Sequence, residues 1–396
     1  MSAGLEINPQ IIEWAIKKYS LNLDKISKSA GVKKETILSW LKKDKFPTYN
    51  QIKKLACALY IPQGYLFLSN PPRSEQILPD FRTVGSSGID NYSQEFRDVI
   101  HSTFNKKCWL REHLINMGKK PLQFLGEFNK DSQVNDVAAS ISEILGIDDD
   151  LRETASNYGK FIKLAVDRCE ENGITVLRRG HPRDFNKREL KVDEFRGFAV
   201  YDEYAPFIFI NSKDSKAAQI FTLFHELAHI WIQEEGISNI NLEEGVKHGG
   251  RIEKLCNAIA AEVLTPTLKF TEAWDGSLCL DENLQVLSTI FKVSSLVVLR
   301  KAYDLKFING NAFRKKYAEC IEKYKEIEKK KSDYRGKKRG FSFKNTFLAQ
   351  NGRMFSRYVV NAALNGEILY RDAAKLLDKK NTSIIDKVSD LFNAEW

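Results

Sequence analysis

The segment FTLFHELAHIWIQEEG, residues 221–236, places two histidines and a glutamate inside an otherwise apolar run. At about 100° per residue in a helix, positions four apart lie about 40° from each other, so His225 and His229 project from one face. Two imidazoles on one face can share a tetrahedral Zn2+, while Glu226, one step round, reaches a water beside the metal. The segment therefore predicts a helix that carries a zinc site.

The residues alone leave several interpretations of this H-E-x-x-H motif open. In a zinc peptidase, Glu226 would accept a proton from water and pass it to the leaving amine. In a structural or sensory zinc site, or in a zinc-free pseudo-enzyme, the same residues would have no catalytic role. With only six histidines in the chain, chance would produce such a motif in roughly one comparable sequence in two hundred. A pair of buried, satisfied histidines is therefore the weaker interpretation.

A third metal ligand must follow the motif. The metzincin pattern would require glycine and histidine where this sequence has Ile232 and Glu235, so that class is excluded. Glu235 itself lies about 80° from the ligand face of a continuous helix. It is therefore a poor ligand unless the helix breaks.

The next candidates lie in RIEKLCNAIAAEVLTP, residues 251–266, which has the pattern of an amphipathic helix. Glu253 and Glu262 are about 180° apart around this helix, so both cannot face one metal. Glu253 shares its face with Asn257, which could hold the ligand carboxylate or nearby backbone. Glu262 is near the end of the helix and is expected to face solvent.

Short β-branched and aromatic segments precede the motif and predict strands. They are GITVLRR, RGFAVYD and APFIFIN, at residues 173–179, 196–202 and 205–211. Most of the remaining chain has helical periodicity. We therefore expect an α+β fold, with a minimal zincin core in which a small sheet supports the motif helix. An N-terminal all-α domain and a C-terminal helical region would flank this core.

The N-terminal segment predicts short helices separated by turn residues. In LDKISKSAGVKKETILSWLKK, the apolar residues are spaced to bury one face of two helices that meet at Gly31. Residues 8–68 resemble the lambda-repressor-like (Xre) helix-turn-helix domains. The resemblance implies DNA contact at the start of the second helix. The implied contact residues are Lys33, Lys34, Thr36 and Ser39.

The exposed face of this second helix departs from the usual DNA-reading composition. It offers lysines but no arginine, asparagine or glutamine, the residues that most often pair with two atoms of one base. Phosphate contact is therefore better supported than base-specific reading. A protein-docking module with solvated lysines is the alternative.

A second resemblance covers about residues 150–300. FRGFAVYDEYAPFIFINSKDSKAAQIFTLFHELAHIWI followed by EKLCNAIAAEVLTP is similar to the ImmA/IrrE metallopeptidases, which show H-E-x-x-H and then E-x-x-x-N-x-x-A-x-x-x-L-x-P. The resemblance implies zinc ligands His225, His229 and Glu253, with Glu226 as general base. Cys256 departs from the usual alanine and is expected to pack in the core.

His248 is a further candidate because it lies in GVKHGG, whose glycines indicate a loop. It could donate a hydrogen bond to a transition state, although an exposed loop histidine without a role is the alternative. The patterns together predict four regions. They are a helix-turn-helix domain at 1–70, a linker with connecting helices at 71–150, the metallopeptidase domain at 151–310 and a basic helical region at 311–396.

The net charge of +9 is concentrated in two places. Residues 1–72 hold eleven lysines against five acids, and residues 301–345 hold fifteen Lys or Arg against six acids. The six cysteines are scattered without a CxxC pair, which favours reduced thiols. With neither a leader pattern nor a long apolar run, a cytoplasmic protein without a membrane partner is expected.

Two classes of function follow from these features. The family resemblance implies a zinc endopeptidase that cuts a regulatory protein, such as a repressor or a partner in a toxin–antitoxin pair with a nuclease toxin. The alternative is a DNA-binding transcriptional regulator or antitoxin-like protein whose zinc domain senses a signal or docks a partner. A homodimer is an assembly that the sequence leaves open.

Overall fold

The structure is a computed structural model in which two compact units can be described. An N-terminal unit contains residues 5–71, and a larger unit contains residues 95–393. The described residues are 5–18, 23–59, 61, 63–71, 93–182, 188–233, 236–238, 250–333 and 342–393. Residues 72–92 of the expected linker region at 71–150 lie outside the described residues.

The N-terminal unit is a small helical bundle. Its helices are α1 (Pro9–Lys18), α2 (Leu23–Ala30), α3 (Lys34–Leu41), α4 (Tyr49–Ala58) and the 3-10 helix η1 (Gln63–Phe67). Gly31 has a φ of 64° in the turn between α2 and α3, a conformation that glycine adopts at little cost. Ile26, Ile37 and Trp40 are buried in the common core, as their spacing predicts.

The larger unit contains a four-stranded sheet with the order β1-β3-β2-β4. The strands are β1 (Thr175–Arg179), β2 (Gly197–Val200), β3 (Phe207–Asn211) and β4 (Gly236–Ser238). β1 pairs parallel with β3, whereas β2 pairs antiparallel with both β3 and β4. The three predicted strands are thus present, and β4 joins them from the end of the motif segment.

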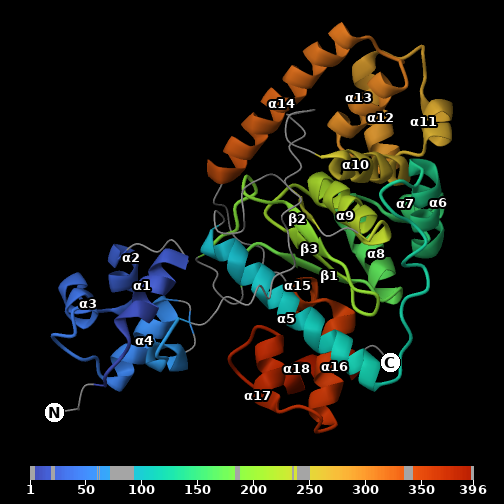
Figure 1. Ribbon diagram of the computed structural model, residues 1–396. Coiled ribbons are helices and arrows are strands. Elements are labelled where there is room, and N and C mark those ends of the chain that lie inside the picture. Colours follow the sequence, from blue (N-terminus) through green and yellow to red (C-terminus); the bar gives the residue numbers. More distant parts are fainter. Residues whose placement is uncertain are drawn as a thin grey trace. The chain divides into compact units, whose positions relative to one another are not determined.

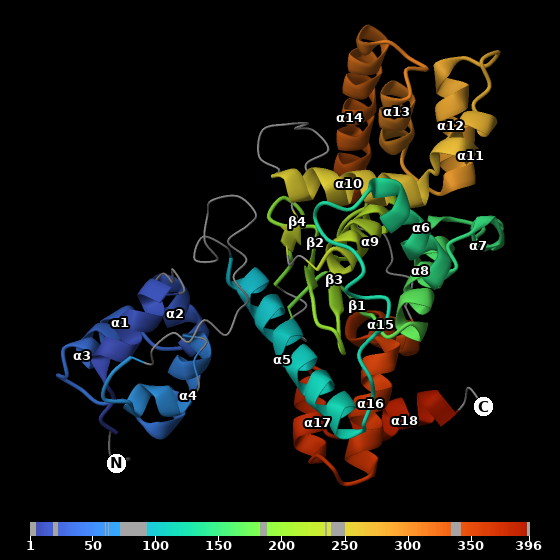
Figure 2. The same ribbon diagram turned by 45° about the vertical axis from the view of Figure 1, so that its right-hand side comes forward.

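Helices cover both faces of this sheet, and their bounds complete the fold (Figures 1 and 2). They are α5 (Gln94–Asn116), α6 (Val134–Leu145), α7 (Asp149–Thr154), α8 (Tyr158–Glu171), α9 (Lys216–Trp231), α10 (Arg251–Leu264), α11 (Thr267–Ala273), α12 (Leu280–Phe291), α13 (Ser295–Asp304), α14 (Gly310–Asp333), α15 (Phe343–Asn351), α16 (Arg353–Leu364), α17 (Tyr370–Leu376) and α18 (Ile384–Asn393). The small sheet within a mainly helical unit confirms the α+β core.

Alternate side chains of the strands face different helices, as strand geometry requires. Ile208 and Ile210 of β3 belong to the same core cluster as the apolar residues of α9. On the opposite face, Phe207 lies 5.8 Å from Phe355 of α16, measured between ring centroids. β1, β2 and β3 are therefore buried on both sides. β2 and most of β3 are apolar, whereas β1 also carries Thr175, Arg178 and Arg179.

The helices after α10 divide into two groups. α14 continues from α13, and the rings of Tyr303 and Phe313 stack 4.6 Å apart across the two helices. α15 instead contacts β1, and α16, α17 and α18 pack on one another (Figure 2). In the part of the chain that the structure describes, no single helix is long and apolar enough to cross a membrane, although the bent pair α12 and α13 meets that length and composition test together.

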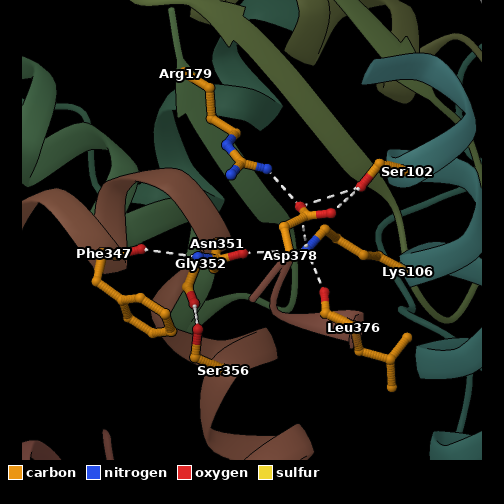
Figure 3. A network of polar contacts seen from close by, with 9 residues as sticks. All are labelled: Ser102, Lys106, Arg179, Phe347, Asn351, Gly352, Ser356, Leu376 and Asp378. Atoms are coloured by element: carbon orange, nitrogen blue, oxygen red, sulfur yellow. Dashed lines mark hydrogen bonds and ion pairs between the residues drawn. The ribbon is translucent and has the colours of Figure 1, made fainter. Parts of the chain in front are cut away.

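A buried ionic cluster joins this C-terminal group to α5 and β1 (Figure 3). The carboxylate of Asp378, just after α17, lies 3.0 Å from Lys106 Nζ and also contacts the Arg179 guanidinium. Ser102 Oγ donates to Asp378 Oδ1 at 3.0 Å, and Lys106 Nζ donates to Asn351 Oδ1 at 3.1 Å. All three charged side chains are at most 4% exposed. The cluster therefore connects segments that are more than 190 residues apart in sequence.

A second buried carboxylate fixes the start of α16. Glu170 of α8 accepts hydrogen bonds from the backbone N–H groups of Arg353, at 2.8 Å, and Met354, at 3.2 Å. Burial raises the pKa of Glu170 to about 7, although these N–H groups act in the opposite direction. The N-terminus of α16 is thus capped by a residue from another helix rather than by its own preceding residue.

Candidate metal centre

The motif helix α9 forms as predicted and lies in the middle of the core. Ser215 caps it, because its Oγ accepts a hydrogen bond from Ala218 N at 3.2 Å. The side chains of His225, Glu226 and His229 are at most 1% exposed. Burying such polar groups is unfavourable unless each finds a partner, so their presence indicates a specific site.

Helix α10 packs against α9 and supplies the third donor. It begins at Arg251, and Glu253 stands in its first turn. Backbone N–H groups at a helix N-terminus favour a carboxylate, so this position suits an ionised glutamate. The pairing of α9 with α10 therefore sets a carboxylate opposite the two histidines.

The three side chains converge on one point. His225 Nε2 and His229 Nε2 are 3.1 Å apart. Glu253 Oε2 lies 3.2 Å from His225 Nε2, and Glu253 Oε1 lies 3.3 Å from His229 Nε2. Among the described residues, these three form the group of His, Cys, Asp or Glu donors that could hold a metal ion.

The protonation states suit a cation. His225 Nδ1 lies 3.0 Å from Asn257 Oδ1, which can only accept, so Nδ1 carries the proton and Nε2 keeps its lone pair. Burial lowers the pKa of His225 and favours the neutral ring. Burial alone would raise the pKa of Glu253, but its polar contacts with His225 and His229 outweigh burial and lower that pKa, so the carboxyl is ionised.

A zinc ion fits this donor set. Bonds of about 2.0–2.1 Å in a tetrahedral site place ligand atoms roughly 3.3–3.4 Å apart, close to the separations found here. Glu253 Oε1 is buried and accepts no hydrogen bond, and a cation between it and the imidazoles would satisfy it. The residues therefore match the requirements of a three-ligand zinc site.

Asn257 gives a testable prediction for this site. Asn257→Ala removes the acceptor of His225 Nδ1–H, so the ring loses the contact that fixes its tautomer and orientation. Zinc affinity is expected to fall by about 10–100-fold, as for other partners of metal-bound histidines. Competition with a chromogenic chelator measures this change. Asn257→Asp keeps an acceptor oxygen and serves as the control, and unchanged affinity in Asn257→Ala would contradict the assigned contact.

The other predicted residues of this region have different outcomes. The expectation that Glu262 faces solvent is wrong, because its carboxylate accepts from Thr267 N at 2.8 Å and lies 2.6 Å from Lys301 Nζ. The turn at the end of α10 brings these partners to it. Cys256 is fully buried within the core cluster. Glu235 and His248 lie outside the described residues.

The predicted DNA-contact residues lie at α3 of the N-terminal unit. Lys33 is exposed immediately before the helix. Lys34 forms an exposed ion pair with Asp24 at 3.0 Å, and Ser39 Oγ donates to Thr36 O at 2.7 Å. The Ser39 hydroxyl proton is thus used within the helix, whereas the Lys33 ammonium faces solvent.

Comparisons with known proteins bear on the larger unit. Residues 169–303 match the Peptidase M78 family model, described as an IrrE N-terminal-like domain. Residues 351–390 match a model described as a domain of unknown function, DUF8813. A search of the curated proteins finds no match to this chain.

The first match includes His225, His229, Glu253 and Glu226, and the M78 family is a zinc-type peptidase family. Neither match covers residues 8–68, so the helix-turn-helix resemblance stays a prediction. The match supports the ImmA/IrrE resemblance of residues 169–303, a segment related to zincin-like metallopeptidases.

Proposed function

We propose that this chain is a zinc-dependent endopeptidase that cleaves a regulatory protein. The observation that carries the proposal is the convergence of His225, His229 and Glu253, with a second carboxylate, Glu226, on the same helix as the histidines. Three protein ligands leave a position for water or substrate, as in catalytic zinc sites, whereas structural sites use four. The match to a peptidase family model supports the same assignment.

Each side chain of the site would have a separate role in peptide hydrolysis. His225, His229 and Glu253 would hold the metal, and Asn257 would orient His225. A zinc ion there supplies a Lewis acid that lowers the pKa of a water and polarises a peptide carbonyl. Glu226 would accept the proton from the attacking water and then deliver it to the leaving amine nitrogen. Because Glu226 is buried, bulk water screens its charge weakly.

The proposed substrate is a regulatory partner of the repressor or toxin–antitoxin type. This part of the proposal rests on the ImmA/IrrE resemblance. Glu226→Gln protein, immobilised and exposed to lysate of the native host, is expected to retain such a partner because it binds without cutting. Wild-type protein added to the retained material should then produce a defined cleavage fragment by mass spectrometry. Retained proteins that wild-type protein leaves intact would contradict an endopeptidase role.

The N-terminal unit favours a second candidate function, that of a DNA-binding regulator or antitoxin-like protein. Its support is the glycine turn between α2 and α3, together with exposed Lys33 at the start of α3. Phosphate contacts of this kind release counterions, so affinity should fall as salt rises. In this candidate, the zinc domain would sense a signal or dock a partner.

Fluorescence anisotropy with a duplex from the protein's own promoter tests this candidate. Lys33→Ala is expected to weaken binding and to reduce the salt slope by about one, because one phosphate contact is lost. Lys160→Ala, an exposed substitution in the larger unit, is the control. Glu226→Gln should leave DNA binding unchanged. Absence of binding by the wild-type chain at low salt would exclude the DNA-binding candidate.

A further inference from the structure

Gly197, the first residue of β2, lies against the face of α9 that carries Glu226. A Cβ atom at this position would lie 2.5 Å from Thr222 Cγ2, 2.9 Å from Phe209 O and 3.0 Å from Glu226 Oε1. Thr222 and Glu226 are four residues apart, so they lie on one side of the helix. The backbone of β2 therefore lies close enough to the Glu226 carboxylate that a side chain at position 197 would crowd it.

The surroundings of Gly197 leave little room for adjustment. β2 is an inner strand, and Gly197 pairs with Ile210 on one side and with Ser238 on the other. Thr222 and Glu226 are at most 1% exposed. Close-packed interiors do not yield to an added methyl group without displacing a neighbour. A larger residue at 197 must therefore move the strand, the helix or the Glu226 carboxylate.

Glu226 and the metal donors have different neighbours. His225 and His229 point to Glu253 of α10, whereas Glu226 approaches β2. A side chain added at position 197 can therefore displace the Glu226 carboxylate, the proposed proton acceptor, while His225, His229 and Glu253 stay together. Reaction rates depend steeply on such positions, because a displacement of about 1 Å can lower a rate about a hundredfold.

We propose that Gly197 is a positioning residue, whose missing side chain lets β2 hold the Glu226 carboxylate in place beside the metal-binding donors. This inference rests on the proposed function, because it takes Glu226 as the proton acceptor. The contact with Thr222 offers a way to separate positioning from simple packing. Thr222→Ser deletes the Cγ2 atom that lies closest to the added methyl group, whereas the contacts with Phe209 O and Glu226 Oε1 remain.

The experiment compares Gly197→Ala, Thr222→Ser and the double variant in the full chain. Gly276→Ala is the matched control, because a Cβ there would meet no atom within 4 Å. The readouts are urea unfolding, zinc affinity by chelator competition, and kcat and KM on a defined synthetic peptide library followed by mass spectrometry. The double variant is expected to unfold at a lower urea concentration than wild type, because the contact with Phe209 O remains. It should nevertheless be folded without urea, bind zinc normally and keep its KM. Its kcat should fall about tenfold to a hundredfold, whereas Thr222→Ser and Gly276→Ala keep theirs. Wild-type kcat in the double variant would overturn the proposal.

A second readout does not depend on turnover. The visible absorption of the Co2+-loaded chain reports the surroundings of the metal, so the double variant and Glu226→Gln should both differ from wild type, and Thr222→Ser should not. If wild-type protein cleaves no peptide better than Glu226→Gln does, the proposed peptidase function fails, and the spectrum alone decides the role of Gly197. A double variant with the wild-type spectrum would then overturn the positioning role.

Discussion

Glu226→Gln is expected to lower the rate of peptide cleavage by about two to four orders of magnitude, the usual contribution of a positioned general base. Glutamine has nearly the same shape as glutamate but cannot take up the proton that the attacking water releases. Its effect should therefore appear in kcat, while the binding of metal and substrate is kept. Turnover of the peptide library by wild-type and variant protein measures the change.

The control for this substitution is Glu272→Gln, which makes the same chemical change on the exposed surface of α11. It should cleave at the wild-type rate. Zinc content must be measured in parallel, because Glu226 stands next to His225 and a loss of metal would mimic a loss of catalysis. A zinc-loaded Glu226→Gln protein that cleaves at the wild-type rate would contradict the proposed mechanism.

Asp378→Asn is expected to lower the free energy of unfolding by about 3–5 kcal/mol, the usual cost of removing one partner from a buried ionic group. Asparagine keeps an oxygen for the Ser102 hydroxyl and tolerates the left-handed backbone of residue 378, whose φ is 55°. The substitution therefore isolates the charge. Without the carboxylate, Lys106 and Arg179 would remain as two buried cations.

Urea unfolding at neutral pH measures this loss, with exposed Asp390→Asn of α18 as the control. Burial would raise the pKa of Asp378, but Lys106 and Arg179 outweigh it and lower that pKa. The carboxylate therefore stabilises the fold fully above the unfolded pKa of about 4, and this contribution is lost as the pH falls through the lower folded value. The variant should lack that acid-dependent loss. Equal stability of both variants at pH 7 would show that the cluster does not stabilise the fold.

The metal centre was the most predictable part of the molecule, because its signal is local. The spacing of His225 and His229 follows from helix geometry alone. The choice of Glu253 as the third metal ligand required the family resemblance. Helix geometry excluded only that Glu253 and Glu262 both bind the same metal. The strands were predicted because they are short, β-branched and aromatic.

The remaining features depend on contacts that no local pattern contains. Arg179 and Asp378 are 199 residues apart in sequence but form an ion pair. The sequence around Asp378 reads only as a charged residue at the end of a helix and does not indicate this partner. Glu262 has the spacing of a solvated residue but is held by Lys301, which belongs to another helix. Gly197 did have a local signal, because an isolated glycine in a strand often marks a close backbone approach. The identity of the approaching group, Glu226, came only from the fold.

Native mass spectrometry of the purified wild-type chain tests the central claim most directly. After incubation with zinc and removal of excess metal, the account predicts a mass increase of about one zinc ion per folded chain, and the same increase in Glu226→Gln. A folded wild-type chain that carries no zinc under these conditions would contradict the assignment of His225, His229 and Glu253 as metal ligands.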